Sequence, residues 1–242
     1  MNIISNANRQ IILDTETTGM NMGAGPVHLG HRIIEIGCVE VINRRLTGRH
    51  FHEYIRPDQL IDEEAIAVHG ITNEFVANKP RFHEVAQQFI QFIDGAEIVA
   101  HNASFDVSFM DHEFSMLQPK GPKTSDICQI LDSLAIAKYL HPGQKNNLDA
   151  LCKRYGIDNS RRDLHGALLD AEILADVYLQ MTGGQTKFNL SNEQVGQEAG
   201  GINRLNSNRS QLKVVGASAD ELTMHEQRLD LVAKSGKCLW RG

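Results

Sequence analysis

The sequence has few cysteines, no long hydrophobic run and no excess of basic residues. Its four cysteines lie far apart, with no CxxC pair and no companion histidines at zinc spacing, which argues against a zinc finger or a disulfide framework. We therefore expect reduced thiols and a cytoplasmic protein. No apolar run approaches the length of a membrane span, and the first ten residues lack the pattern of a signal peptide, so we expect no membrane segment.

The charge balance limits how the chain can hold a nucleic acid. It has 24 Lys and Arg against 30 Asp and Glu, which gives a formal net charge of −6. Proteins that hold nucleic acid by themselves usually carry a basic surplus. Any affinity for nucleic acid must therefore be weak, local or supplied by a partner.

The length and the local composition predict one domain with an appendage. The chain has 242 residues, of which 41% are hydrophobic, enough for one sizeable core. From Gly183-Gly184 onward the sequence becomes rich in Gly, Asn, Gln and Ser, which is typical of a flexible linker. We expect a folded domain over residues 1–183, a linker over 184–211 and renewed order over 212–242.

The apolar patterns predict a mixed α/β domain. Three strands joined by short turns indicate an antiparallel meander, and the following segments alternate between helices and strands. The expected strands are 10–16, 32–43, 50–57, 96–102 and 124–131. The expected helices are 62–70, 81–95, 104–117, 132–140, 146–155 and 166–181.

Asp14 and Glu16 end the first apolar strand, within the stretch ILDTETTGM. Because side chains alternate along a strand, both carboxylates point to the same side. Their repulsion makes a purely structural role unfavourable, whereas a bound divalent cation would favour the arrangement. The alternative is a strand that runs out into a polar turn formed by Thr17, Thr18 and Gly19.

Three further residues carry groups suited to metal or proton chemistry. Asp106 follows a predicted strand and lies in the first turn of the next helix, a usual place for functional groups. The alternative is an aspartate that only interacts favourably with the helix dipole. Asp170 falls within the apolar stripe of a helix, where a carboxylate is costly unless a metal or partner compensates. His165, in the loop before that helix, can take a proton from water, although a lone loop histidine is usually a surface residue.

Together these residues form a D-x-E pair, a later aspartate and an H-x4-D pair. The pattern resembles the DEDD exonuclease superfamily, in the subgroup with a catalytic histidine. Within it, the chain is similar to the family of proofreading ε subunits of bacterial DNA polymerase III over nearly its whole length. The similar stretches are ILDTETTGM, HRIIEIGCVEVINRRLTG, VHGI, HNASFD, NLDALCKRYGID and LHGALLDAEILADVYLQMTGGQT.

The resemblance implies a ribonuclease H-like fold with a mixed five-stranded sheet and a 3′–5′ exonuclease that removes mismatched terminal nucleotides from DNA. It implies that Asp14, Glu16, Asp106 and Asp170 hold two Mg²⁺ or Mn²⁺ ions and that His165 is the general base on the attacking water. By the same resemblance, the residues that contact the terminal nucleotide are Asp14, Thr15, Glu16, Thr17, Thr18, Glu64, His69, Asn102, Phe105 and Asp170. Two of these residues have a purely structural alternative: His69 would be a histidine at a helix end, and Phe105 would be part of an apolar helix stripe.

The C-terminal segment 212–242 predicts binding to another protein. It contains several Leu and Val residues and the only tryptophan of the chain, Trp240, but it is too short to bury them by itself. Ser218 and Glu221 have the spacing of a capping box, so we expect a helix there. The resemblance implies that the segment binds the polymerase α subunit, and the alternative is that it folds back on the domain.

The linker carries a short candidate motif, QTKFNL, with Gln185, Phe188 and Leu190. It resembles the motif by which bacterial replication proteins bind the sliding clamp, or it is a chance match in a linker. The family also commonly has a small accessory subunit, which the sequence itself does not reveal.

Two other functions fit part of the sequence. An RNA-trimming 3′–5′ exonuclease of the same superfamily would use the same chemistry, and the wall that reads a 2′-OH is not visible in the sequence. The C-terminal tail argues against it. A non-catalytic adaptor subunit would keep the fold and use the tail to bridge partners, but the five reactive residues argue against that.

Overall fold

The computed structural model describes residues 7–160, 164–183, 216–236 and 240, and the chain divides into two compact units, Met1–Phe188 and Asn189–Gly242. In the second unit one helix is described, α9 (Ala219–Ser235). The predicted linker over 184–211 and the clamp-motif residues lie outside the described residues. Within the described part of the chain, no helix has the length and apolar character needed to cross a membrane.

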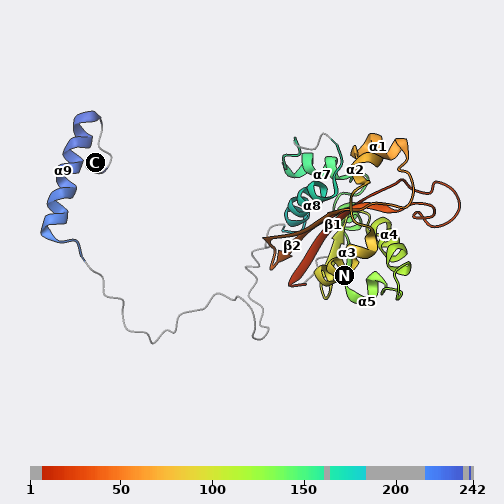
Figure 1. Cartoon of the computed structure of the whole chain (residues 1–242). Helices are drawn as coiled ribbons and strands as arrows, with labels where there is room; N and C mark the ends of the chain where they lie inside the picture. The colour runs from red at the N-terminus through yellow and green to blue at the C-terminus, as the bar shows by residue number, and fades with distance from the viewer. Residues whose placement is uncertain (1–6, 161–163, 184–215, 237–239, 241–242) are drawn as a thin grey trace, which may run out of the picture. The chain divides into compact units, whose positions relative to one another are not determined.

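The first unit is built on one five-stranded sheet. In chain order its strands are β1 (Arg9–Thr17), β2 (Ile33–Ile42), β3 (Arg45–Tyr54), β4 (Glu97–Ala100) and β5 (Gln129–Asp132). Their order across the sheet is β3-β2-β1-β4-β5, with the first three strands antiparallel and β1, β4 and β5 parallel (Figure 1). The predicted mixed sheet is confirmed.

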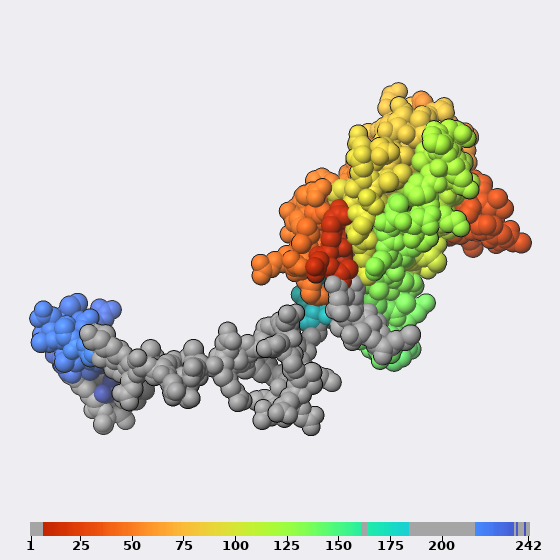
Figure 2. Space-filling view, turned by 90° about the horizontal axis from the view of Figure 1, so that it is seen from below, coloured from red at the N-terminus to blue at the C-terminus, as the bar shows by residue number. Residues whose placement is uncertain are grey.

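Helices cover both faces of this sheet. They are α1 (Glu63–His69), α2 (Asn73–Val76), α3 (Phe82–Ile93), α4 (Ala103–Ser115), α5 (Thr124–Ile127), α6 (Ser133–Leu140), α7 (Leu148–Tyr155) and α8 (Ala167–Thr182). One core lies between the sheet and α3 and α4, whose yellow and green atoms dominate the view from below (Figure 2). A second core lies between the other face and α6, α7 and α8.

The alternation of side chains along β1 decides which face each functional residue occupies. Ile11 and Leu13 belong to the core under α3 and α4, whereas Ile12 belongs to the core under α8. Asp14 and Glu16 therefore continue the face of Ile12 and point toward α8.

Two predicted boundaries are wrong for physical reasons that act beyond the local pattern. The third strand begins at Arg45 rather than at residue 50, because Asn43 and Arg44 both adopt positive φ and form a two-residue hairpin turn. The predicted strand 124–131 starts instead with α5, whose first N–H, on Thr124, donates to Asp111 Oδ1 at 2.7 Å. Only its second half forms a strand, β5.

The hairpin turn also fastens the end of α8. The guanidinium of Arg44 donates to the carbonyl oxygen of Leu179 at 2.9 Å and to Thr182 Oγ1 at 3.0 Å. The carbonyl oxygen of Leu179 also accepts from the N–H of Gly183 at 2.8 Å, so Arg44 adds a second, charged donor at the C-terminus of the helix. The β2–β3 hairpin therefore holds the last turn of α8.

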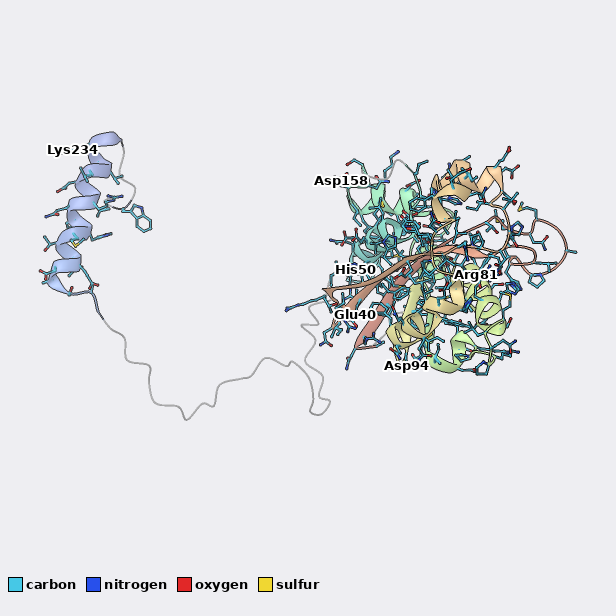
Figure 3. The ribbon with its side chains drawn as sticks, viewed as in Figure 1. Glu40, His50, Arg81, Asp94, Asp158 and Lys234 are labelled. Carbon is cyan, nitrogen blue, oxygen red and sulfur yellow. The ribbon has the colours of Figure 1, made fainter. Side chains whose placement is uncertain are left out.

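Glu40 is a buried carboxyl group at the end of β2 remote from Glu16 (Figure 3). Arg9 Nε donates to its Oε1 at 2.8 Å, Arg49 Nη1 donates to the same oxygen at 3.1 Å, and Thr47 Oγ1 donates to Oε2 at 2.9 Å. Burial acts to raise the pKa of Glu40, but these bonds and the arginine charges outweigh it, so the pKa lies below its ordinary value.

The predicted capping box of α9 is present. Glu221 N–H donates to Ser218 Oγ at 3.3 Å, and Ser218 N–H donates to Glu221 Oε2 at 2.7 Å. Leu222, Leu231 and Trp240 expose more than half of their surface. Apolar side chains are thus exposed on the second unit, as the sequence predicts.

Candidate metal and catalytic site

The site lies where the C-terminal end of β1 meets the first turn of α8. Asp170 is buried within the predicted apolar stripe of α8, and His165 stands in the connection immediately before the helix. Ligand atoms of Glu16, His165 and Asp170 all lie within 4.8 Å of one another. The structure therefore brings together three predicted residues from two distant parts of the sequence.

His165 is the accessible member of this group. Its Nδ1 lies 3.4 Å from Asp170 Oδ2, and 47% of its side-chain surface is exposed, against 4% for Asp170. The backbone N–H of His165 donates to the carbonyl oxygen of Val68 at 3.1 Å, which ties the loop to α1. An exposed imidazole beside a buried carboxylate can exchange protons with water at the site.

Asp106 reaches the site region from α4, on the other face of the sheet. Its carboxyl group is buried and accepts a hydrogen bond from Thr15 Oγ1 at 2.8 Å. Burial raises the pKa of Asp106 to about 7, although the Thr15 bond acts in the opposite direction, and the negative charge of Asp132 adds to the increase. A nearby cation would stabilise the ionised form that burial disfavours.

Asp14 and Asp106 are not part of the three-residue group, as far as the described residues show. Burial raises the pKa of the Cys38 thiol on β2 well above its ordinary value. The negative charges of Asp106 and Asp14 raise this pKa further. The two carboxylates thus lie near one buried residue, beside the group formed by Glu16 and Asp170.

The donor set fits a hard divalent cation. Glu16 and Asp170 are buried, carry oxygen ligands and lie close together, an arrangement that is unfavourable without positive charge. Carboxylate oxygens suit Mg²⁺ and Mn²⁺, and no cysteine joins the group. The residues present therefore fit the cation that the sequence predicts.

His69 is one of several buried residues among the predicted substrate contacts. Its Nδ1 accepts a hydrogen bond from the N–H of Ile71 at 3.0 Å, while its buried Nε2 has no hydrogen-bond partner within the described residues. A buried donor without a partner calls for a ligand or water. Glu64, by contrast, is exposed in the first turn of α1.

The threonines on either side of Glu16 make most of their hydrogen bonds within the protein. Thr15 binds Asp106, and Thr17 Oγ1 donates to the carbonyl oxygen of Gly19 at 2.8 Å. Thr18 has both backbone groups engaged, since its N–H donates to Arg32 and its carbonyl accepts from Asp62. Their side chains therefore shape the end of β1.

Asn102 and Phe105 flank Asp106 at the start of α4. Asn102 is exposed with a φ of 74°, and its N–H donates to Asp132 Oδ1 at 3.1 Å. Phe105 is half-buried, with its ring centroid 4.9 Å from that of Phe109. Phe105 thus belongs to the apolar stripe and is also partly accessible, so both of its predicted roles remain open.

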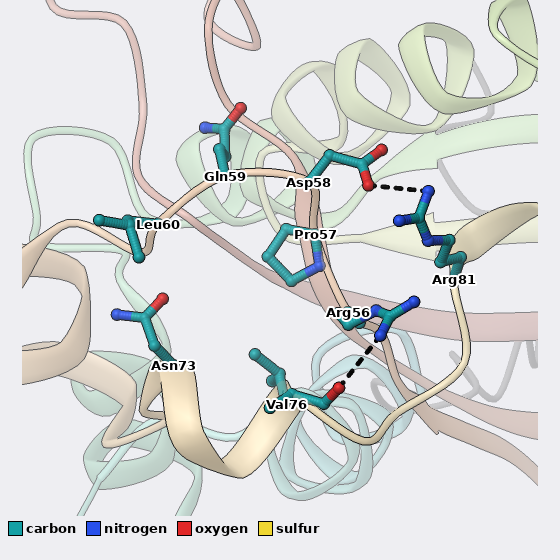
Figure 4. Close-up of a pocket in the computed structure, with 9 residues that line it drawn as sticks. Arg56, Pro57, Asp58, Gln59, Leu60, Asn73, Val76 and Arg81 are labelled. Carbon is teal, nitrogen blue, oxygen red and sulfur yellow. Dashed lines mark hydrogen bonds and ion pairs between the residues drawn. The ribbon is translucent and has the colours of Figure 1, made fainter.

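A separate polar cavity of about 430 Å³ lies beside the connection from β3 to α1 (Figure 4). Arg81 Nη1 lies 3.0 Å from Asp58 Oδ1, and Arg56 Nη1 donates to the carbonyl oxygen of Ala77 at 3.3 Å. None of the predicted site residues lines this cavity.

Sequence reasoning missed Glu35 on β2. It is buried, is the Cα partner of Glu16 across the sheet, and contacts the first turn of α8. The available signal was a glutamate in the apolar run IIEIGCVEV, which marks a buried acid without saying what it binds.

Comparisons with known proteins show the family of the chain. The family model RNase_T, described as Exonuclease, matches residues 11–178, and the chain therefore belongs to this exonuclease family. The DNA polymerase III subunit epsilon of Escherichia coli (strain K12) is 57% identical over 237 residues, which cover 96% of this chain and 97% of that protein. The corresponding subunit of Haemophilus influenzae is 54% identical over 248 residues, covering 97% and 95%.

A solved structure supports the same assignment. Exonuclease X in complex with 5′ overhanging duplex DNA is 29% identical and superposes with a TM-score of 0.54, covering 72% of this chain and 91% of that one. The predicted family and the ribonuclease H-like fold are confirmed. The chain is a 3′–5′ DNA exonuclease of the proofreading kind, from a family that uses divalent metal ions.

Proposed function

We propose that Asp14, Glu16, Asp106 and Asp170 hold two Mg²⁺ or Mn²⁺ ions and that His165 is the general base. The observation that carries this proposal is the convergence of Glu16, His165 and Asp170 within 4.8 Å. When bound, such ions lower the pKa of an attacking water and neutralise charge on the phosphate and the leaving 3′ oxygen.

The residues of the chain perform the remaining tasks. The four carboxylates supply negative charge, which binds the cations and holds them at one end of the sheet. His165 removes the proton from the attacking water at one of its ring nitrogens, and its exposed position allows that proton to pass on to solvent. Thr15 holds the carboxyl group of Asp106 in one orientation through the 2.8 Å hydrogen bond.

The terminal nucleotide lies, in this proposal, between β1, α1 and α4. The buried Nε2 of His69 supplies a hydrogen-bond donor, and Glu64 lies on the same short helix. Thr15, Thr17 and Thr18 form the floor, while Asn102 and Phe105 approach from the start of α4. Base stacking on Phe105 contributes about 1–3 kcal/mol and is independent of sequence, as proofreading requires.

The second unit connects this activity to a polymerase. The curated relatives are subunits of DNA polymerase III, and similarity extends over 96% of this chain, including its C-terminal segment. We assign residues 212–242 to binding of the polymerase α subunit, residues 184–211 to a linker with a sliding-clamp motif, and residues 1–183 to catalysis. A small accessory subunit is a further expected partner of the catalytic domain.

The deciding experiment offers 3′-mismatched DNA, matched DNA and matched RNA to the wild type and to Asp14→Ala in Mg²⁺. We expect mononucleotides from the 3′ end, faster from the mismatched terminus because an unpaired end costs less to bring into the site. Asp14→Ala and samples with EDTA should release none. Equal rates on RNA would favour the RNA-trimming function, and release by Asp14→Ala would contradict the metal assignment.

A further inference from the structure

The first turn of α8, which leads to Asp170, packs directly against the backbone of β2. Gly37 provides the room, because a Cβ there would overlap backbone atoms of Ala167 and Leu168. Gly37 is also the Cα partner of Asp14. Such a close approach of helix to strand requires glycine. The helix therefore starts directly above the pair of β1–β2 residues that carries Asp14.

The neighbouring pair on the same face consists of Glu16 and Glu35. Glu35 Oε2 accepts a hydrogen bond from the N–H of Ala167 at 3.1 Å. The N-cap residue of α8 is Gly166, which has no side chain to cap the helix. Glu35 thus supplies, from a position 132 residues earlier in the chain, a negatively charged acceptor for one of the first N–H groups of α8, which have no partner within the helix.

His52 on β3 holds the other side of Glu35. Its Nε2 lies 2.7 Å from Glu35 Oε1, so both carboxyl oxygens of Glu35 are engaged. Burial, followed by the negative charge of Glu35, raises the pKa of Tyr54, whose ring lies 4.9 Å from that of His52. The carboxyl group is therefore fixed by residues of the neighbouring strand β3 and of helix α8.

A second buried acid opposite Glu16 is unfavourable in itself. Like charges directly across antiparallel strands repel, and Glu35 is only 2% exposed. A hydrophobic residue would avoid this cost if only packing were required. Glu35 also does not belong to the ligand group of Glu16, His165 and Asp170 in the described part of the chain.

We propose that Glu35, oriented by His52, is a positioning residue that places the first turn of α8 and thereby aligns Asp170 and His165 with Glu16. Asp170 lies one helical turn beyond Ala167, and His165 lies two residues before it, so a shift or fraying of this turn displaces both. The inference rests on the roles proposed above for Asp170 and His165.

The test compares Glu35→Leu and Glu35→Gln in the full chain. Leucine removes the acceptor, whereas the amide oxygen of glutamine can still accept from Ala167. We expect Glu35→Leu to lower kcat and Mn²⁺ affinity about 10–100-fold, the range for partners of metal ligands, with KM for single-stranded DNA nearly unchanged. Glu35→Gln should restore most of both. In the metal-free protein, hydrogen exchange of the Ala167 amide should be faster in Glu35→Leu than in Glu35→Gln.

Glu40→Leu is the matched control, because Glu40 is an equally buried glutamate on the same strand, away from α8. It should lower the melting temperature without changing kcat or Mn²⁺ affinity. Equal losses in Glu35→Leu and Glu40→Leu, or unchanged Mn²⁺ affinity and Ala167 exchange in Glu35→Leu, would overturn the inference. Asp170→Ala, measured in parallel, separates the two proposals: if it retains Mn²⁺ affinity, the site assignment itself fails.

Discussion

At the scale of single residues, Asp106 shows how the site depends on a cation. Its carboxyl group is buried against Thr15, and burial raises its pKa to about 7, from about 3.9 in an unfolded chain. Above pH 7 the group is ionised in both states, so the folded protein without metal bears the full cost of the buried charge. Below about pH 4 the group is neutral in both states and this cost disappears.

Asp106→Asn should therefore separate activity from stability. Hydrolysis should fall about 100-fold or more, since a proposed metal ligand is lost. In EDTA at pH 8 the variant should be more stable than the wild type in urea unfolding, and this advantage should shrink as the pH is lowered to 5. If the difference in free energy of unfolding between variant and wild type is the same at pH 8 and pH 5, the buried-charge explanation is contradicted.

His165 allows a prediction about the reaction rate. Imidazolium cannot accept a proton, so the wild-type rate should decrease as the pH falls and the ring becomes protonated. His165→Ala should lose most activity, retain Mn²⁺ binding and lack this acid-side decrease. Single-turnover rates from pH 5.5 to 8.5 provide the measurement. If the decrease persists in His165→Ala, another group accepts the proton.

At the scale of elements, one half-buried histidine connects the end of β4 to the start of α6 and to the loop before α7. His101 follows β4, its Nε2 donates to the carbonyl oxygen of Asn146 at 2.8 Å, and its Nδ1 lies 2.9 Å from Ser133 Oγ at the start of α6. Burial lowers the pKa of His101 below its ordinary value. The neutral ring therefore belongs to the folded state.

Stability should follow from this as the pH falls. The unfolded chain takes up the proton near pH 6.5, before the folded state does, so the contribution of His101 is complete above that pH and is lost below it. His101→Gln keeps a donor for Asn146 but cannot be protonated. Between pH 7.5 and 5.5 its free energy of unfolding in urea should therefore decrease less than that of the wild type. An equal decrease would exclude His101 as the cause.

Elements with a local signal were predictable, and those set by distant contacts were not. Asp14 and Glu16 follow from strand alternation, and Asp170 from an apolar helix stripe, each visible within a few residues. The helix at Thr124 depends on Asp111, and the seat of α8 depends on Glu35, 132 positions from Ala167. Neither contact leaves a pattern in the neighbouring sequence, so the sequence predicted the candidate ligands but not the contacts that we propose to orient them.

At the scale of the whole molecule, the chain divides into two compact units, and we propose that the first carries the exonuclease and the second its attachment to the polymerase. Deleting residues 185–242 should leave activity on free single-stranded DNA intact, because the sheet and all five proposed catalytic residues lie before the cut. Co-purification with the polymerase α subunit should be lost. A truncated chain that still binds the polymerase would indicate that the first unit makes the contact.

The candidate clamp motif requires a finer change. Replacing Gln185, Phe188 and Leu190 with alanine should weaken binding to the sliding clamp, because a short segment binds through its few apolar anchors. Binding to the polymerase and activity on single-stranded DNA serve as controls and should not change. Unaltered clamp affinity in surface plasmon resonance would mean that the motif is a chance match.

The hydrogen bonds from Arg44 to the end of α8 have a mechanical consequence if the enzyme is tethered through its C-terminal segment. The described part of the first unit ends at Gly183, directly after α8, so a load transmitted along the chain from the second unit would reach the C-terminal end of that helix first. Hydrogen bonds from Arg44 to Leu179 and Thr182 would pass part of that load to the β2–β3 hairpin, where ladder hydrogen bonds would share it. We therefore expect such a load to disturb the first turn of α8, which carries Asp170, less than it would without Arg44.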